Sequence, residues 1–268
     1  MVSKLYEKVN YTMNVDNLIS HYIREYDIVK ANINILYREG LLSKERYDYF
    51  YNLPKMEREV AIGILQRNEN YSRALKNGII RAKKEFFEAN NIQDWQVLAI
   101  KNDAIYLIDI PALITKIDNI EFKLKNIYTS FYHIDKYECY YYKDPMGSNE
   151  ILDVKGISDS NLELHKNYFL EFLKTVFDMA QKEPVENILE FLKAFNENYM
   201  ALNLDVEFYR EFNAESLYAL KQTLSDYNSY KSRCVDKSMK KHLDISYNTY
   251  IIRKLYQIYS SIYFSHKK

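Results

Sequence analysis

The scarcity of glycine is the feature that most constrains this chain. Its 268 residues include 5 glycines and 4 prolines, against usual shares of about 7% and 5%. The two glycines closest in sequence, Gly147 and Gly156, are 9 residues apart. Phosphate-binding loops, dinucleotide-binding turns and the nucleophile elbow of hydrolases all need glycines only a few residues apart. These sites are therefore excluded, and so few breakers predict long regular elements without a flexible linker.

Charge and cysteine content narrow the class of protein further. Lys plus Arg number 37 and Asp plus Glu number 37, so the formal net charge is 0, and any nucleic-acid surface must be local. Cys139 and Cys234 are too few for a zinc cluster or a disulfide scaffold. The longest apolar stretch, residues 104–114, is broken by Asp109 and Pro111. We therefore expect a reduced, cytoplasmic protein with no membrane segment.

Hydrophobic periodicity divides the chain into three parts. Apolar residues at helical spacing predict helices before residue 90, over residues 15–25, 31–37, 46–51, 55–65 and 71–89. Aromatic and β-branched residues with partial alternation predict strands between residues 96 and 154. The helical period returns from Ser158. We predict an α+β fold in which helices flank a small, mainly antiparallel sheet, with domains at residues 1–157 and 158–268.

Two aspartates lie where a carboxylate needs a partner. Asp27 interrupts the apolar stretch 26–29, and Asp103 separates the apolar runs 97–100 and 104–108. A carboxylate in such surroundings requires a cation, a metal or hydrogen-bond donors. Two carboxylates that meet from different strands can hold a pair of divalent cations, which activate a 3′-hydroxyl and stabilise a leaving pyrophosphate. The alternative is that each is an ordinary turn or salt-bridged acid, with Lys101 as an obvious partner of Asp103.

The helix predicted over residues 71–89 has a basic face. Arg73, Lys76 and Lys84 fall near one side of it, and such a face could bind a triphosphate. The alternative is a solvated helix face whose basic residues pair with neighbouring acids.

Several segments, taken in order, resemble the palm of family B DNA polymerases. Residues 26–36, Tyr-Asp-Ile-Val-Lys-Ala-Asn-Ile-Asn-Ile-Leu, resemble motif A, a strand with an aspartate followed by a helix. Residues 100–108, Ile-Lys-Asn-Asp-Ala-Ile-Tyr-Leu-Ile, resemble motif C, a hairpin that carries a catalytic aspartate. Four further segments match in order: a fingers helix (70–87), the strand after motif C (122–131), a primer-contacting motif (135–137) and the passage from palm to thumb (152–157).

The sequence departs from the family pattern at two positions that bear on catalysis. Motif C of the family has two aspartates around a threonine, whereas here only the second is kept, as Asp103, and Lys101 stands where the first would be. In motif A, Asn32 occupies the position of the tyrosine that excludes ribonucleotides. Lys101 could replace a metal electrostatically, or it could mark a palm that has lost its chemistry, and both alternatives stay open.

The resemblance implies a role for each matching residue. Asp27 and Asp103 would be the catalytic metal ligands, binding Mg²⁺ or Mn²⁺. Five residues would bind substrate away from the metal: Arg73 and Lys76 the incoming triphosphate, Lys136 and Tyr137 the primer terminus, and Lys155 a backbone phosphate. Lys101, at the position of the missing aspartate, would be a sixth substrate-binding residue. The partners would be a DNA primer–template, a nucleotide triphosphate and, if the polymerase is split, a second polymerase subunit.

These patterns predict a nucleic-acid-binding, polymerase-like protein. It would be a minimal, split or degenerate DNA polymerase palm and thumb that, if active, performs metal-dependent nucleotidyl transfer. The alternative is a non-enzymatic protein-interaction module of a virus or mobile element. The order of the motifs favours the first, and the zero net charge and the missing aspartate favour the second.

Overall fold

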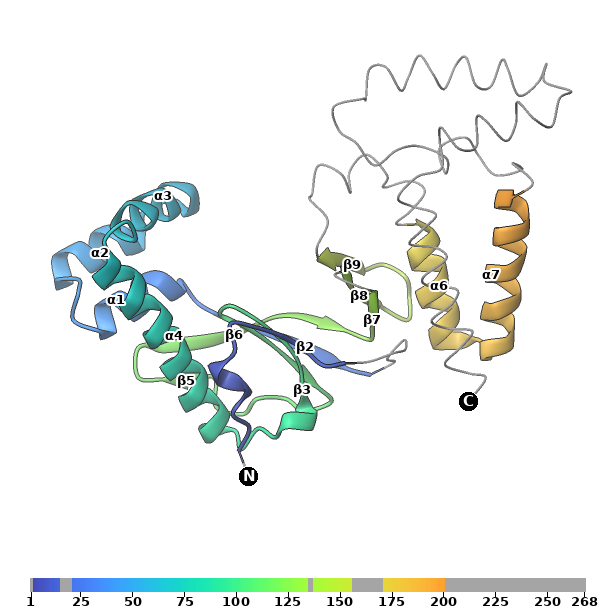
Figure 1. The fold of residues 1–268 in the computed structure, drawn as a ribbon, viewed down its shortest axis with the longest axis horizontal. Helices are drawn as coiled ribbons and strands as arrows, with labels where there is room; N and C mark the ends of the chain where they lie inside the picture. Colours follow the sequence, from blue (N-terminus) through green and yellow to red (C-terminus); the bar gives the residue numbers. More distant parts are fainter. Residues whose placement is uncertain (1, 15–20, 135–136, 156–170, 201–268) are drawn as a thin grey trace, which may run out of the picture. The chain divides into compact units, whose positions relative to one another are not determined.

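The computed structural model of the chain describes residues 2–14, 21–134, 137–155 and 171–200, drawn in colour in Figure 1. The chain forms two compact units, one of residues 1–14 and 21–128 and one of residues 15–20 and 129–268. The predicted α+β class is confirmed, because helices precede and follow two antiparallel sheets. The predicted division between residues 157 and 158 lies outside the described residues and stays a prediction.

The first unit is built on a 6-stranded antiparallel sheet. In spatial order its strands are β1 (Asn10–Thr12), β3 (Val97–Lys101), β4 (Ala104–Ile108), β2 (Ile23–Ile28), β6 (Ile120–Tyr128) and β5 (Lys116–Ile117). Strand β2 lies between β4 and β6, so both of its edges are hydrogen-bonded. The helix predicted over residues 15–25 is wrong from residue 21 onward, because residues 21–22 are not helical and β2 begins at Ile23, while residues 15–20 lie outside the described residues. Two paired neighbours outweigh the local helical spacing.

Four helices of the first unit were predicted correctly apart from a few end residues. They are α1 (Ala31–Arg38), α2 (Lys44–Asn52), α3 (Lys55–Leu65) and α4 (Glu69–Ala89), and two short 3₁₀ helices, η1 (Leu5–Glu7) and η2 (Asp94–Gln96), complete the unit. The Ser43 side chain accepts a hydrogen bond from the Arg46 amide at 3.3 Å and so caps α2.

Helices α1 and α4 pack against one face of this sheet (Figure 1). The ring of Phe86 on α4 stacks on Phe122 of β6 with centroids 4.2 Å apart and also meets Tyr26 of β2 at 5.7 Å. Where α1 crosses α4, a Cβ atom added at Gly78 would clash with the Ile35 side chain. A glycine at this point therefore allows the two helices to come close together. Side chains alternate between the two faces along β2, so Glu25 and Asp27 lie on the face opposite to that of Tyr26.

The second unit contains a 3-stranded antiparallel sheet and two described helices. Strands β7 (Ser130–Ile134), β8 (Tyr137–Lys143) and β9 (Glu150–Lys155) pair in that order, and α6 (Glu171–Lys182) and α7 (Val185–Met200) follow. Tyr141 of β8 stacks on Phe177 of α6 at 5.4 Å, and Phe172 of α6 packs on Phe191 of α7 at 5.8 Å. Over the part of the chain that the structure describes, no helix combines the length and the apolar character needed to cross a membrane.

Substituting the two helical glycines of the first unit should have opposite effects on stability. Gly78→Ala places a methyl group against Ile35, and we expect it to lower the free energy of unfolding by about 1–2 kcal/mol, because overpacking exceeds the gain in helix propensity. Gly63→Ala on α3 meets nothing within 4 Å, and we expect a gain of about 0.5–1 kcal/mol. Urea unfolding of both variants measures this, and equal shifts would contradict the close crossing.

Candidate functional site

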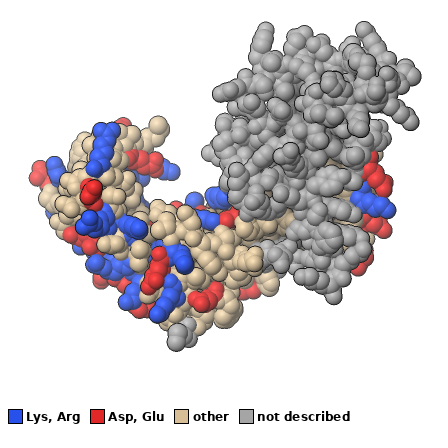
Figure 2. All heavy atoms as spheres, viewed as in Figure 1, with Lys and Arg blue, Asp and Glu red and all other residues tan. Residues whose placement is uncertain are grey.

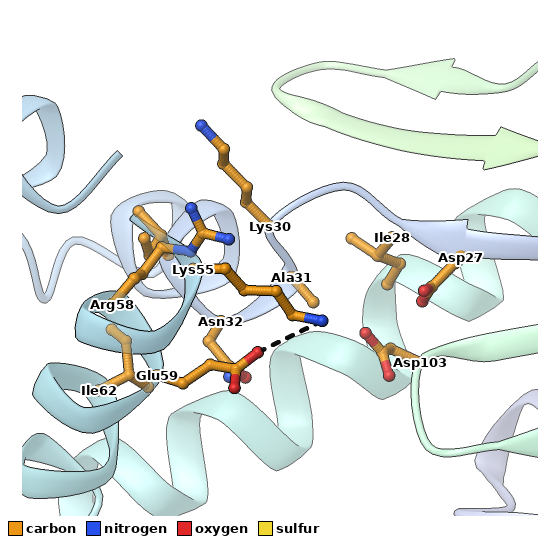
Figure 3. Close-up of a pocket in the computed structure, with 11 residues that line it drawn as sticks. Asp27, Ile28, Lys30, Ala31, Asn32, Lys55, Arg58, Glu59, Ile62 and Asp103 are labelled. Atoms are coloured by element: carbon orange, nitrogen blue, oxygen red, sulfur yellow. Dashed lines mark ion pairs between the residues drawn. The ribbon is translucent and has the colours of Figure 1, made fainter. Parts of the chain in front are cut away.

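Asp27 and Asp103 meet at one end of the pairing between β2 and β4. Tyr26 of β2 lies opposite Ile105 of β4, so Asp27 comes level with Ala104, and Asp103 directly precedes it in the turn between β3 and β4. Figure 3 shows the two carboxyl groups pointing toward each other, and both residues line one pocket. The sheet therefore brings together two acids that are far apart in the sequence.

The surroundings of Asp103 change its titration. Burial and the neighbouring charge of Asp27 raise the pKa of Asp103 from 3.8 to about 6. The side chain of Asp27 is 35% exposed and reaches the pocket described below. Since two carboxylates in contact repel when both are ionised, this pair favours either a shared proton or a bound cation.

A buried lysine holds the turn that carries Asp103. Lys83 of α4 is 1% exposed, and its ammonium donates to the backbone carbonyls of Asn102 at 3.0 Å and Lys8 at 2.6 Å. The Asn102 amide donates to the Val9 carbonyl at 2.7 Å. Burial lowers the pKa of Lys83 to about 8, and the charge of Asp103 acts in the opposite direction. The turn is therefore fixed from two sides, with a positive charge behind the acid.

The junction between β2 and α1 is also held rigidly. Lys30 adopts the left-handed conformation (φ 46°, ψ 47°) that lysine rarely takes. Its ammonium donates to the Tyr51 carbonyl at 2.7 Å and lies 3.3 Å from the centre of the Tyr51 ring. The buried Asn34 side chain donates to the Val29 carbonyl at 2.6 Å. These contacts offset the backbone strain and hold the Lys30 ammonium at Tyr51, while Figure 3 shows its side chain extending away from the two acids.

A pocket of about 250 Å³ opens beside the two acids. Asp27 and Asp103 form one side of it, and helices α1 and α3 form the other with three cations, Lys30, Lys55 and Arg58. Figure 3 shows the Lys55 side chain extending from α3 toward the two carboxyl groups, and its ammonium lies 3.8 Å from Glu59. The pocket therefore presents acids and cations to the same small space, which suits an anion that binds together with a metal ion.

Strand β6 brings a further cation to the acids through a bulge. The register against β2 shifts between Glu25 and Tyr26, so that Lys125 is the extra residue. The Lys125 ammonium lies 3.0 Å from the buried Glu25 carboxylate and 3.8 Å from that of Asp27. Bulges commonly re-aim a side chain next to a functional site.

The residues that would bind substrate lie in different places. Arg73 and Lys76 are exposed on α4 and are not among the residues that line the pocket. The Lys101 ammonium donates to the Thr12 hydroxyl on β1 at 2.9 Å. Lys155, in the second unit, forms an ion pair with Asp153 at 2.6 Å.

The expected primer-contacting pair stays untested. Lys136 lies outside the described residues, and Tyr137 is described only as the first residue of β8.

Four cations of the site were missed by sequence reasoning: Lys30, Lys55, Arg58 and Lys125. Lys55 and Arg58 could have been found only from a weak pattern, two basic residues one turn apart on a helix that was predicted correctly. No local pattern identifies Lys30 or Lys125, since a left-handed residue and a bulge arise from tertiary packing. Figure 2 shows that basic and acidic side chains alternate over the visible face of the first unit, so charge density alone does not mark the site.

The two acids supply part of the ligand set that a metal ion needs. Across residues 2–14, 21–134, 137–155 and 171–200, no group of three His, Cys, Asp or Glu side chains could hold a metal ion. Asp27 and Asp103 supply two carboxylates to the same space. Mg²⁺ is commonly bound by one or two carboxylates plus phosphate oxygens and water. The pair therefore fits a metal ion whose remaining ligands are water or the phosphate oxygens of a substrate.

Comparison with known proteins gives one family. A family model described as Bacteriophage PBS1 gene 130 protein matches residues 1–261, which spans both compact units. No curated protein matches the chain.

Replacing Asp103 should stabilise the protein at neutral pH. The folded state holds the Asp103 proton more tightly than the unfolded state, so this group's contribution to stability falls as pH rises from about 4 to about 6. We expect Asp103→Asn to raise the free energy of unfolding by about 1–3 kcal/mol at pH 7.5. The gain should disappear at pH 4, where the wild-type carboxyl is protonated.

Urea unfolding at both pH values in metal-free buffer measures this change. Asp118→Asn is the matched control, because Asp118 is exposed and asparagine tolerates its positive φ of 51°. A loss of stability for Asp103→Asn at pH 7.5 would contradict the unfavourable pairing of the two acids.

Proposed function

We propose a polymerase-like function for this chain, which belongs to the Bacteriophage PBS1 gene 130 protein family. In this proposal the first unit performs metal-dependent nucleotidyl transfer on a DNA primer–template. The observation that carries the proposal is the meeting of Asp27 and Asp103 beside a pocket with three cations. The resemblance to family B palms supports the same pair of acids. Mg²⁺ or Mn²⁺ is the expected cofactor, and the proposed location is the cytoplasm of the infected cell.

The two acids would have the role of metal ligands. When bound, the metal would supply Lewis-acid activation of a primer hydroxyl and charge neutralisation at the phosphates. Asp27 presents a partly exposed carboxylate from the rigid central strand β2. Asp103 is fixed by a turn whose backbone is tied to Lys83. Rigid support of this kind keeps both ligands in place without a cost of ordering them on binding.

The three pocket cations would bind the triphosphate. Arg58 offers a guanidinium that can bind two phosphate oxygens at once, and Lys55 offers a flexible point charge. Burial and the charge of Arg58 lower the pKa of Lys30. An incoming polyanion would relieve this repulsion between Lys30 and Arg58. The α3 cations are therefore better placed for a triphosphate beside the acids than Arg73 and Lys76.

A protein-interaction module is the second candidate function, and one observation favours it. Met56, Val60 and Ile64 recur every four residues along α3 and are 80%, 65% and 56% exposed. An apolar stripe of this kind is typical of a surface that another protein covers. A split polymerase would combine the two functions, with the stripe available to a second subunit.

Primer extension with Mg²⁺ or Mn²⁺ tests the proposal directly. We expect extension by the wild type and at least a hundredfold loss for Asp27→Asn and for Asp103→Asn, because each removes one of two ligand carboxylates. Asp118→Asn should extend as the wild type does. Extension that survives both active-site substitutions would show that the activity does not come from this site.

Binding of primer–template separates the remaining possibilities. Affinity that falls steeply with salt, without extension, would support a degenerate or split polymerase. Neither extension nor salt-dependent binding would overturn the nucleic-acid function and favour the interaction module.

Triphosphate affinity should depend on α3 more than on α4. We expect Lys55→Ala and Arg58→Ala each to raise the Kd for a labelled Mg²⁺–triphosphate complex about tenfold, because each removes a charge from the pocket. Arg46→Ala, which removes an exposed charge from α2, is the control and should change the Kd by less than twofold. The opposite result, with loss only for Arg73→Ala and Lys76→Ala, would place the triphosphate on α4 as the sequence predicted.

A further inference from the structure

Lys125 lies at the acid pair because of an irregularity in β6. Asn126 faces Glu25 and Leu124 faces Tyr26, so Lys125 is the extra residue of a bulge in β6. Its side chain is 51% exposed. In a regular strand, side chains alternate strictly, and Lys125 and Asn126 would point to opposite faces of the sheet. The bulge instead lets Lys125 and Asn126 both lie on the face that carries Glu25 and Asp27.

A buried carboxylate holds the Lys125 ammonium in place. Glu25 is 1% exposed and accepts hydrogen bonds from Asn126 at 2.7 Å, from Tyr128 at 3.0 Å, from Lys125 at 3.0 Å and from Tyr106 at 3.1 Å. With four donors around it, the buried Glu25 carboxylate is held in place and anchors Lys125.

The same ammonium acts on both catalytic acids. It lies 3.8 Å from the Asp27 carboxylate, and its charge also favours the ionised form of Asp103. Lys101, which the sequence suggested as the electrostatic partner, donates instead to Thr12 on β1. A lysine half-exposed beside two acids can move aside when another cation enters.

We propose that Lys125 is a built-in counter-cation of the Asp27–Asp103 pair, a positioning residue that sets how tightly the site binds a divalent metal ion. Without metal, its ammonium compensates one of the two carboxylate charges. With metal, it repels the ion and keeps the affinity moderate. This inference rests on the metal site of the proposed function.

Mn²⁺ binding followed by electron paramagnetic resonance of the free ion tests the proposal. We expect Lys125→Met to bind Mn²⁺ about tenfold more tightly than the wild type, since an ammonium a few ångströms from a divalent ion weakens binding by about that factor even at the dielectric constant of water. Lys125→Arg keeps the charge and should stay within twofold of the wild type. Lys116→Met, which removes an exposed lysine from β5, should also stay within twofold.

The outcomes separate this inference from the proposed function. Mn²⁺ binding by the wild type with equal or weaker binding by Lys125→Met would overturn the counter-cation role and leave the metal site intact. If Lys125→Met does not fold because Glu25 loses its partner, the double variant Glu25→Gln/Lys125→Met removes both charges, and the same gain in affinity is expected.

A measurement without metal tests the ion pair independently of the metal site. In a double-mutant cycle, we expect the loss of Tm in Lys125→Met to shrink when Asp27→Asn is also present, because the repulsion that Lys125 relieves is then gone. Additive changes in Tm would overturn the coupling. Absence of Mn²⁺ binding in all variants would overturn the metal site, while the Tm cycle would still decide the role of Lys125.

Discussion

Like-charge repulsion between Asp27 and Asp103 is the constraint that the rest of the first unit accommodates. The antiparallel register of β2 against β4 brings the two carboxyl groups together, and burial makes their joint ionisation costly. The positive charges nearby come from different elements: Lys83 from α4 behind the turn and Lys125 from the bulge in β6. An arrangement that costs stability and recruits buried polar groups is typical of a functional site.

The support for this pair lies deeper than the pocket itself. Glu25 and Lys83 are both 1% exposed, and each makes hydrogen bonds that fix an element carrying a site residue. A buried charge is tolerable only when its hydrogen bonds are made, so these networks allow a single arrangement of β2, β6 and the β3–β4 turn. The hydrogen bonds of these buried polar groups therefore fix the positions of the two acids. A core of purely apolar residues at these positions would pack as well but would leave the turn and the bulge unanchored.

Sequence periodicity predicted the helices of the first unit because their apolar stripes are local. Residues 55–65 were predicted as a helix with the bounds that α3 has, and residues 31–37 nearly so. Strand β2 was missed at Ile23 because its buried residues do not alternate strictly with more exposed ones. Its partner β4 follows about 80 residues later in the chain. Pairing over such a distance cannot be predicted from the hydrophobic pattern of β2. The bulge at Lys125 likewise cannot be predicted from the pattern of β6.

The site was only half predictable for a related reason. Asp27 and Asp103 could be found because an acid within an apolar run is anomalous wherever the chain goes. A cation on an exposed helix is not anomalous, so the densest basic helix, α4, was the natural prediction for a phosphate site. The apolar stripe of α4 faces the sheet and α1, however, which leaves Arg73 and Lys76 exposed, away from the side chains that line the pocket. The shorter helix α3 carries fewer basic residues but directs Lys55 and Arg58 into the space beside the acids. Tertiary placement, more than the number of charges, decides which helix can meet a polyanion there.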